Sequence, residues 1–209
     1  MKNGHNTGGI FDILPTMAEE REFIDEQEHP GFDRYRALVE AFHGNETDAF
    51  VDDLRALIEE DPFYLDPYLL TVEFLEELEL HDEAAYMLEK AYQRAVDLVT
   101  AEDGNWPDKL RWGFVENRHI IRTLVSKAVF YWKSDQNEEA LELFGRLLKM
   151  NPNDNAGNRY FILGILTGMS FQEFTDRFDK GGYYDNEIDE WFNDHYTKFP
   201  DELGGWDGE

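Results

Sequence analysis

Cysteine, long apolar runs and basic residues are absent or scarce in this sequence, and each gap removes a class of protein. Without cysteine there is no disulfide framework, no thiolate metal site and no cysteine nucleophile. No stretch approaches the ~18 consecutive apolar residues that a membrane-spanning helix needs. Residues 1–9 are polar and glycine-rich and lack the apolar core of a signal peptide, so the expected localisation is cytoplasmic.

The shortage of basic residues sets the charge of the whole molecule. Lys and Arg number 19 against 46 Asp and Glu, which leaves a net charge of −27. Such a field repels the phosphates of nucleic acids and the anionic face of a membrane, so neither is an expected partner. The same field attracts a basic partner, although a solvated acidic surface also serves solubility alone. With 42% hydrophobic and 15% aromatic residues, the chain has the composition of a folded protein.

Apolar residues recur at the spacing of an α-helix along most of the chain. Ala140, Phe144 and Leu147 form one such stripe, and no segment alternates as a β-strand does. The fold class is therefore expected to be all-α. Thr16 with Glu19 forms a capping box and predicts a short first helix that ends before Pro30. The expected helices cover 16–28, 32–43, 48–60, 67–79, 83–101, 117–134, 138–149, 156–167, 171–178 and 186–197.

A repeated pattern organises these helices into pairs. Leu124, Ala128, Tyr131, Ala140, Phe144 and Pro152 carry the spacing of one unit, with small residues where paired helices approach and bulky ones where successive pairs meet. This pattern resembles the tetratricopeptide repeat (TPR) family, whose period is about 34 residues. The segments 116–118, 151–155 and 159–160 also resemble a group of bacterial repeat proteins of unknown function. The resemblance implies a short right-handed α-solenoid of antiparallel helix hairpins.

The resemblance also divides the chain. Residues 1–30 are expected to form an N-terminal arm with a short helix, and residues 31–178 to form the TPR-like repeats. The units are 31–64, 65–98, 121–154 and 155–178, with an insertion at 99–120 that breaks the period. Residues 179–209 are expected to contain a capping helix, which covers the last repeat, and a mobile acidic tail from Pro200.

In TPR arrays the first helix of each hairpin lines a concave groove that holds the partner. Some of the corresponding side chains here are apolar. For these, packing against a neighbouring helix is as well supported as exposure in the groove. Some family members bind the C-terminal carboxylate of a partner with Lys, Arg and Asn side chains. The corresponding residues here are Arg122, Asn158 and Arg159. The nearby carboxylates of Glu73 and Glu76 disfavour such a carboxylate clamp. The predicted partner-binding residues are Tyr35, Val39, Phe42, Leu69, Glu73, Glu76, Arg122, Val125, Val129, Trp132, Arg159 and Leu163.

A search for catalytic and metal-binding motifs finds none. The six histidines show no His-Glu-x-x-His pattern, and neither a nucleophile elbow nor a phosphate-binding glycine loop is present. Glu116 and His119 have the i, i+3 spacing found in di-iron bundles, but the second such pair is missing, which favours a structural polar pair. We therefore expect no catalytic residue, no metal and no cofactor.

These observations favour a non-catalytic scaffold or adaptor that binds a protein or peptide in a helical groove. Residues 46–89 hold fifteen acids and one base, whereas 105–134 hold six bases and two acids. A partner with a basic stretch beside apolar anchors suits such a groove. Two alternatives stay open: an acidic decoy of a nucleic-acid-binding protein, and an enzyme whose site the sequence does not reveal. Self-association through an uncapped hairpin face would also fit.

Overall fold

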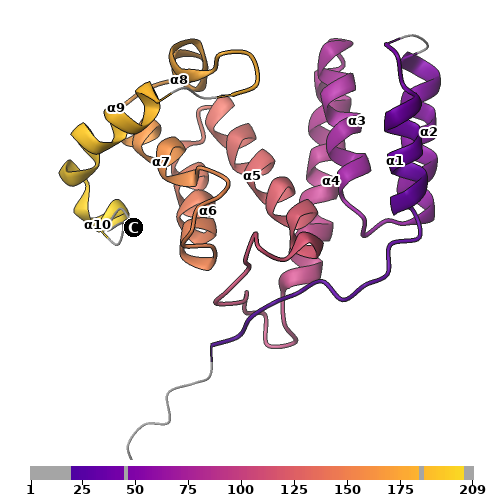
Figure 1. Cartoon of the computed structure of the whole chain (residues 1–209), viewed down its shortest axis with the longest axis horizontal. Helices are drawn as coiled ribbons and strands as arrows, with labels where there is room; N and C mark the ends of the chain where they lie inside the picture. Colours follow the sequence, from indigo (N-terminus) through magenta and orange to yellow (C-terminus); the bar gives the residue numbers. More distant parts are fainter. Residues whose placement is uncertain (1–19, 45–46, 184–185, 205–209) are drawn as a thin grey trace, which may run out of the picture.

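The computed structural model describes residues 20–44, 47–183 and 186–204, and these residues form helices joined by short turns (Figure 1). They contain no β-strand, and an isolated bridge joins Glu22 to Lys109. The all-α prediction is confirmed. In chain order the elements are α1 (Phe32–Ala41), α2 (Thr47–Glu60), α3 (Asp66–Glu77), α4 (His81–Val99), the 3-10 turn η1 (Val115–Asn117), α5 (Arg118–Lys133), α6 (Asn137–Met150), α7 (Asn158–Leu166), α8 (Phe171–Phe178), α9 (Glu187–His195), the 3-10 turn η2 (Tyr196–Lys198) and α10 (Pro200–Leu203).

Local signals explain where several helices begin. Pro67 stands in the first turn of α3, where its missing N–H costs no hydrogen bond. Ser170 caps α8: its hydroxyl accepts a bond from the Glu173 N–H, and the Glu173 carboxylate accepts one from the Ser170 N–H. Gly157 takes the left-handed conformation at the start of α7. The predicted bounds of α8 match the observed ones, and those of α3 and α7 differ from them by one or two residues.

Neighbouring helices along the chain pack side by side, so that they form a row from α1 to α7 (Figure 1). Ala91 and Ala95 of α4 and Ala128 of α5 are fully buried, and such small side chains let helix backbones come close. Among the helices of the described residues, none combines the length and apolar character that a bilayer crossing requires. The division of the row into four repeat units stays a prediction.

Helix α5 lies at the centre of the row and contacts α3, α4, α6 and α8. Trp132 near its end is buried and donates its indole N–H to the Met169 carbonyl over 3.1 Å. The ring fits against Gly164 of α7, where an added Cβ would lie 2.8 Å from Trp132 Cη2 and 3.0 Å from Phe174 Cδ2. Glycine at 164 therefore sets how closely α5, α7 and α8 approach.

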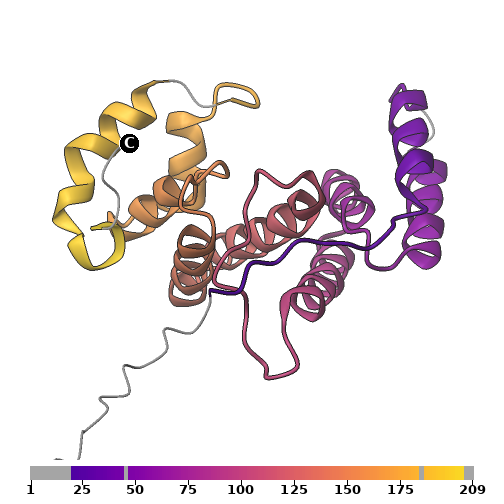
Figure 2. The same ribbon diagram turned by 60° about the horizontal axis from the view of Figure 1, so that its bottom comes forward.

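The predicted short helix at 16–28 is wrong for its described part. Residues 20–31, which we term the strap, run without helix across the lower end of the row from the loop before α5 to α1 (Figure 2). The Phe23 N–H donates to the Lys109 carbonyl, and Arg21 Nη2 donates to the carbonyls of Val99 and Asn105. These tertiary hydrogen bonds replace the bonds a local helix would make. The capping box at Thr16 and Glu19 lies outside the described residues.

The predicted mobile tail also needs correction at its start. Pro200–Leu203 forms α10, and Leu203 is buried in the core together with Ile188 and Trp191 of α9. Proline is favoured in the first turn of a helix, and the apolar residue one turn later is buried when the helix forms. These two features stabilise a helix in this acidic stretch. Residues 205–209 lie outside the described part of the chain.

Replacing Gly164 by Ala is expected to destabilise the fold by about 1–3 kcal/mol, because Trp132 and Phe174 leave no room for a methyl group. Urea unfolding, read by tryptophan fluorescence, measures the change in free energy of unfolding. The matched control is Gly145→Ala in α6, where an added Cβ meets no atom within 4 Å. This control should leave stability unchanged or raise it by up to about 1 kcal/mol. Equal behaviour of the two variants would contradict the packing argument.

Candidate functional site

A shallow pocket lies between α3 and α5, and we term it the groove pocket. It has a volume of about 200 Å³. Five of the predicted partner-binding residues meet in it, from two helices that are about 50 residues apart in the sequence. Its lining consists of Leu69, Val72, Glu73, Glu76, Leu88, Val125, Ser126, Val129, Phe130 and Lys133.

Carboxylates dominate the polar rim of the groove pocket. Burial raises the pKa of Glu73, and the charges of Glu77 and Glu76 raise it further. Lys133 Nζ lies 3.6 Å from a carboxylate oxygen of Glu76 and partly offsets that charge. A cation placed beside Glu73 would therefore relieve repulsion between carboxylates. The pocket combines an apolar floor with an anionic edge.

A second and larger pocket lies at the strap end of the same two helices, and we term it the strap pocket. Its volume is about 450 Å³, and large apolar side chains stand exposed at its edge: Phe32 is 45% exposed and Val115 is 63% exposed. Its lining consists of Gln27, Glu28, His29, Phe32, Tyr64, Asp66, Val115, Glu116, Arg118, His119 and Arg122.

An ion pair between α3 and α5 marks the boundary between the two pockets. Arg122 of α5 and Asp66 of α3 pair through two distinct nitrogen–oxygen contacts, Nε to Oδ1 at 3.1 Å and Nη2 to Oδ2 at 2.7 Å. Tyr35 of α1 stands nearby: its burial raises the pKa of its hydroxyl to about 12, and the charge of Asp66 adds to the effect. Each partner lies one helical turn before a groove residue, Leu69 on α3 and Val125 on α5.

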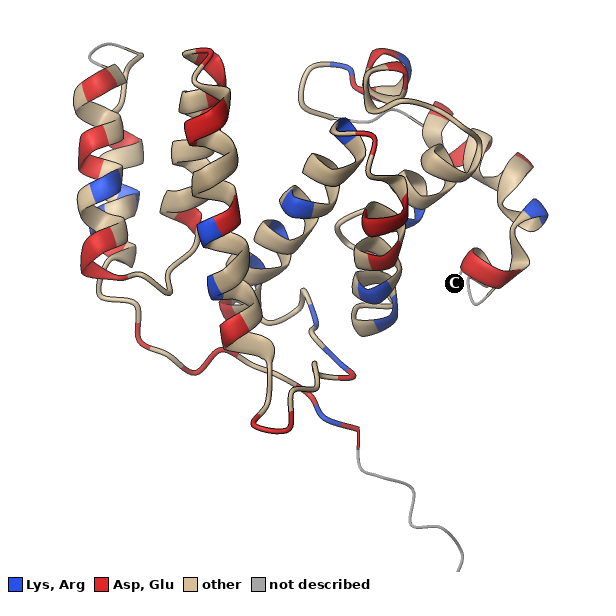
Figure 3. Ribbon diagram, turned by 180° about the vertical axis from the view of Figure 1, so that it is seen from behind, with Lys and Arg blue, Asp and Glu red and all other residues tan. Residues whose placement is uncertain are grey.

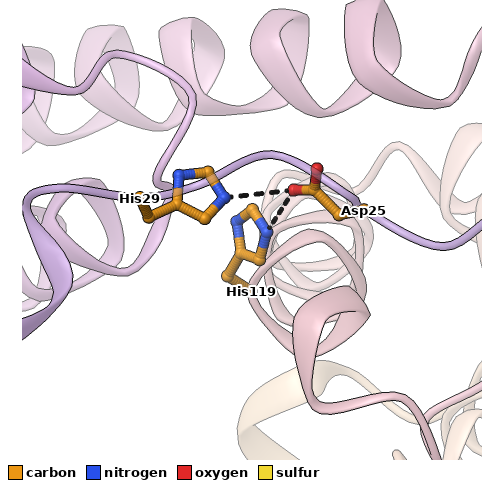
Figure 4. Close-up of side chains that lie close together, drawn as sticks. All are labelled: Asp25, His29 and His119. Carbon is orange, nitrogen blue, oxygen red and sulfur yellow. Dashed lines mark hydrogen bonds and ion pairs between the residues drawn. The ribbon is translucent and has the colours of Figure 1, made fainter.

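Two residues that line the strap pocket, His29 and His119, form a cluster with the buried Asp25 (Figure 4). One oxygen of Asp25, Oδ2, lies 2.9 Å from Nε2 of His119 and 3.2 Å from Nε2 of His29. The other nitrogen of His29, Nδ1, lies 3.3 Å from both carboxylate oxygens of Asp61. The cluster therefore ties the strap to α5 and to the end of α2.

Hydrogen-bond partners define the protonation of both rings. The Leu65 N–H points at Nδ1 of His119 over 3.2 Å, so Nδ1 accepts and Nε2 carries the proton donated to Asp25. Both nitrogens of His29 face carboxylates, which suits an imidazolium. The hydrogen bond to Asp25 raises the pKa of His29 above 6.5 against the effect of burial, and Asp61 adds to the rise.

Asp25 itself is held in the ionised form. Burial by itself would raise the pKa of its carboxyl group, but hydrogen bonds from His119, His29 and the Gln27 N–H outweigh burial. The net result is a pKa well below the ordinary 3.8. The backbone N–H of Asp25 donates to Oδ1 of Asn117, so the carboxylate and the main chain are both anchored.

Three potential metal ligands converge here, because the nearest atoms of Asp25, His29 and His119 all lie within 4.8 Å of one another. Their number and type would suit zinc or non-haem iron. A metal at Nε2 of His119 would require a proton at Nδ1, where the Leu65 N–H already points. Binding a metal would therefore sacrifice that bond and both bonds to Asp25. The arrangement therefore favours hydrogen-bonded ion pairs among these side chains over a bound metal ion.

Three further predicted site residues lie on α1 or directly after it. Tyr35 is half-buried, and its ring meets that of Tyr64 edge-on at 5.6 Å. Phe42 is half-buried, and the centre of its ring lies 4.1 Å from that of Phe50, with the two ring planes tilted by 30°. Val39 is 41% exposed. None of these three residues lines either pocket.

Trp132 and Leu163 were predicted to face the groove, and this prediction is wrong. Trp132 is 2% exposed and Leu163 is fully buried. The joint between α5, α7 and α8 is packed tightly enough to require Gly164, so the inner face of that hairpin pair is core. The structure thus confines the open groove to the α1–α5 half of the row.

The candidates for a carboxylate clamp are bound inside the chain. Arg122 pairs with Asp66, as described above. Arg159 donates to Asp154 over 3.2 Å and lies over the ring of Tyr160, and the Asn158 amide also donates to Asp154. Arg159 lies apart from both pockets. All three side chains thus have hydrogen-bond partners within the chain.

Sequence reasoning missed Asp25, His29 and Asp61. It singled out His119, but paired it with Glu116, which is exposed at the strap pocket instead. His119 and Asp25 are 94 residues apart, so no local spacing could signal their contact. The four-residue spacing of Asp25 and His29 was a weak signal, because the predicted helix ends at residue 28 and leaves His29 outside it.

Comparisons with protein-family models, with curated proteins and with solved structures find no match for this chain.

The charge network predicts a pH dependence of stability. Because the folded-state pKa of His29 is raised, its contribution is fully present below pH 6.5 and is lost as the pH rises through the raised value. The contribution of Asp25, whose pKa is lowered, is present above pH 3.8 and is lost as the pH falls well below that value. His29→Gln should cost about 1.5–3 kcal/mol at pH 6 and flatten the decline towards pH 9.

Urea unfolding of the wild type and of His29→Gln at both pH values tests this prediction. His81→Gln, which replaces an exposed histidine outside the cluster, is the matched control and should behave like the wild type. The same alkaline loss in all three proteins would show that another group causes it.

Proposed function

We propose that this chain is a non-catalytic scaffold that binds a partner protein or peptide in the groove between α3 and α5. One observation carries the proposal: Leu69 and Glu73 from α3 and Val125 and Val129 from α5 line the same open pocket. Residues of two predicted repeat units thus form one surface with an apolar floor. A groove of this kind suits a peptide that contributes apolar anchors.

The packing of the helices supports a TPR-like solenoid as the framework. Leu124, Ala128, Ala140 and Phe144 carry the repeat pattern, and all four side chains are fully buried. Helices α5 and α6 form the hairpin that this pattern requires, and α3 and α4 pack as another pair. On this reading α9 and α10 cap the last repeat.

Charge supports a partner with a basic segment. Acidic residues recur along α2, α3 and α4, whereas basic residues gather on α5 (Figure 3). Two cations of α5 at or beside the groove already face carboxylates: Arg122 pairs with Asp66, and Lys133 Nζ lies 3.6 Å from a carboxylate oxygen of Glu76. The carboxylates therefore dominate what an approaching ligand meets, and a basic segment gains attraction and correct register from them.

Charge reversal in the groove tests the proposal. Glu73→Lys with Glu76→Lys should abolish retention of the partner on the immobilised protein, because it removes the anionic edge of the groove pocket. The control is Asp53→Lys with Glu59→Lys, which makes the same change in charge on exposed positions of α2. The partner is captured from extract, and its retention is measured after a wash in about 0.5 M NaCl, where screening shortens the reach of surface charge to a few ångströms.

Each outcome separates the candidate functions. Loss with the groove variant alone supports a scaffold with a groove-bound partner. Equal loss with both variants, or complete release of the wild-type partner by salt, indicates an acidic decoy held by overall charge. Full retention by both variants contradicts the groove as the binding surface.

A further inference from the structure

The groove pocket and the strap pocket lie end to end along the same two helices. On α5 the strap pocket uses His119 and Arg122, and the groove pocket begins one turn later at Val125. On α3 the corresponding step runs from Asp66 to Leu69. With 1.5 Å per residue in a helix, the mean positions of the residues that line the two pockets are about 10–13 Å apart along α3 and α5. One ligand segment can therefore span both.

We propose that this double pocket binds an extended peptide segment with two apolar side chains four residues apart and Lys or Arg beside them. This inference rests on the proposed scaffold function and gives it a ligand class. In an extended chain, four residues span about 13 Å, and residues i and i+4 point to the same side, whereas i and i+3 do not. The distance between the two pockets thus determines how many residues separate the two apolar side chains, which we term the anchors.

The contact between α3 and α5 favours an extended ligand over a helical one. The two helices touch directly, so the crevice between them cannot admit a third helix of about 10 Å diameter. The groove pocket, at about 200 Å³, has room for a single side chain. The Arg122–Asp66 pair lies between the anchors, where an extended backbone presents N–H and carbonyl groups that need partners.

The strap pocket supplies the larger anchor site. Phe32 and Val115 stand exposed beside it, and large apolar side chains at the edge of a pocket are typical of a surface that a partner covers. The strap positions this pocket, because Gln27, Glu28 and His29 are held there by the buried Asp25 network. A bulky aliphatic or aromatic side chain matches its size.

Charge at the pockets determines which residues accompany the anchors. Within the described residues, Glu28 and Glu116 at the strap pocket and Glu73 at the groove pocket make no ion pair. The nearby cations are engaged, since Arg118 donates to the Trp112 carbonyl and lies over its ring, and Arg122 pairs with Asp66. Lys or Arg next to each anchor would meet an unpaired carboxylate.

Selection from a random 12-residue peptide library displayed on phage, with the full chain immobilised, tests the proposal. Enriched peptides should carry two apolar residues at i and i+4 and an excess of Lys and Arg. Synthetic copies should bind Val115→Glu and Glu73→Lys at least about tenfold more weakly than the wild type, by fluorescence anisotropy. Tyr183→Glu, a substitution at an equally exposed side chain away from both pockets, is the matched control and should bind as the wild type does.

The remaining outcomes overturn the proposal in distinguishable ways. If Glu73→Lys weakens binding of the peptides and Val115→Glu does not, the scaffold function still stands, but the strap pocket holds no second anchor. A spacing of seven residues would indicate a helical ligand lying over the crevice, and enrichment of acidic peptides would refute the charge argument. Peptides insensitive to both variants, or no enrichment, would overturn the scaffold function as well.

Discussion

The burial of α5 on nearly all sides is the constraint on which the rest of the structure depends. Its residues contact α3, α4, α6 and α8, and His119 joins it to the strap. Even a charged residue of α5 is buried. Lys127 is 5% exposed, donates to Glu89 on α4 and lies 4.5 Å from the ring centre of Tyr131. A lysine in such a place is tolerated because a carboxylate and aromatic faces replace its water. The helix thereby fixes both its neighbours and the pockets beside it.

The groove lies where α5 meets α3, whereas core side chains fill the joint of α5 with α7 and α8. On the α7 side, Gly164 allows the Trp132 ring to close the joint. On the α3 side, half-buried Leu69 and Val125 leave space, and the Arg122–Asp66 pair spans it. The difference lies in side-chain size and polarity at a few positions, which is sufficient to make one joint core and the other a surface for binding.

Local chemistry predicted the helices well and long-range chemistry poorly. Pro67 and the Ser170–Glu173 box mark helix starts by interactions within one turn, so they can be recognised in the sequence. The resemblance to TPR arrays singled out Leu69 and Val125, and both line the groove pocket, from α3 and α5. Trp132 and Leu163 show the same periodicity, and only the absence of a Cβ at Gly164 reveals that they are core. The Asp25 network and the strap depend on partners up to 94 residues away, which no local pattern encodes.

The strap has a consequence for the order in which the chain acquires its structure during synthesis. Its residues leave the ribosome before every other described segment, yet their partners lie at Lys109, Asn117 and His119. About 90 further residues must therefore emerge before the strap can dock, which at typical elongation rates takes several seconds. Helices α2, α3 and α4 are available to pack during that time. The strap is thus the first part of the described chain to be synthesised and among the last to dock. It docks only after α5 is in place.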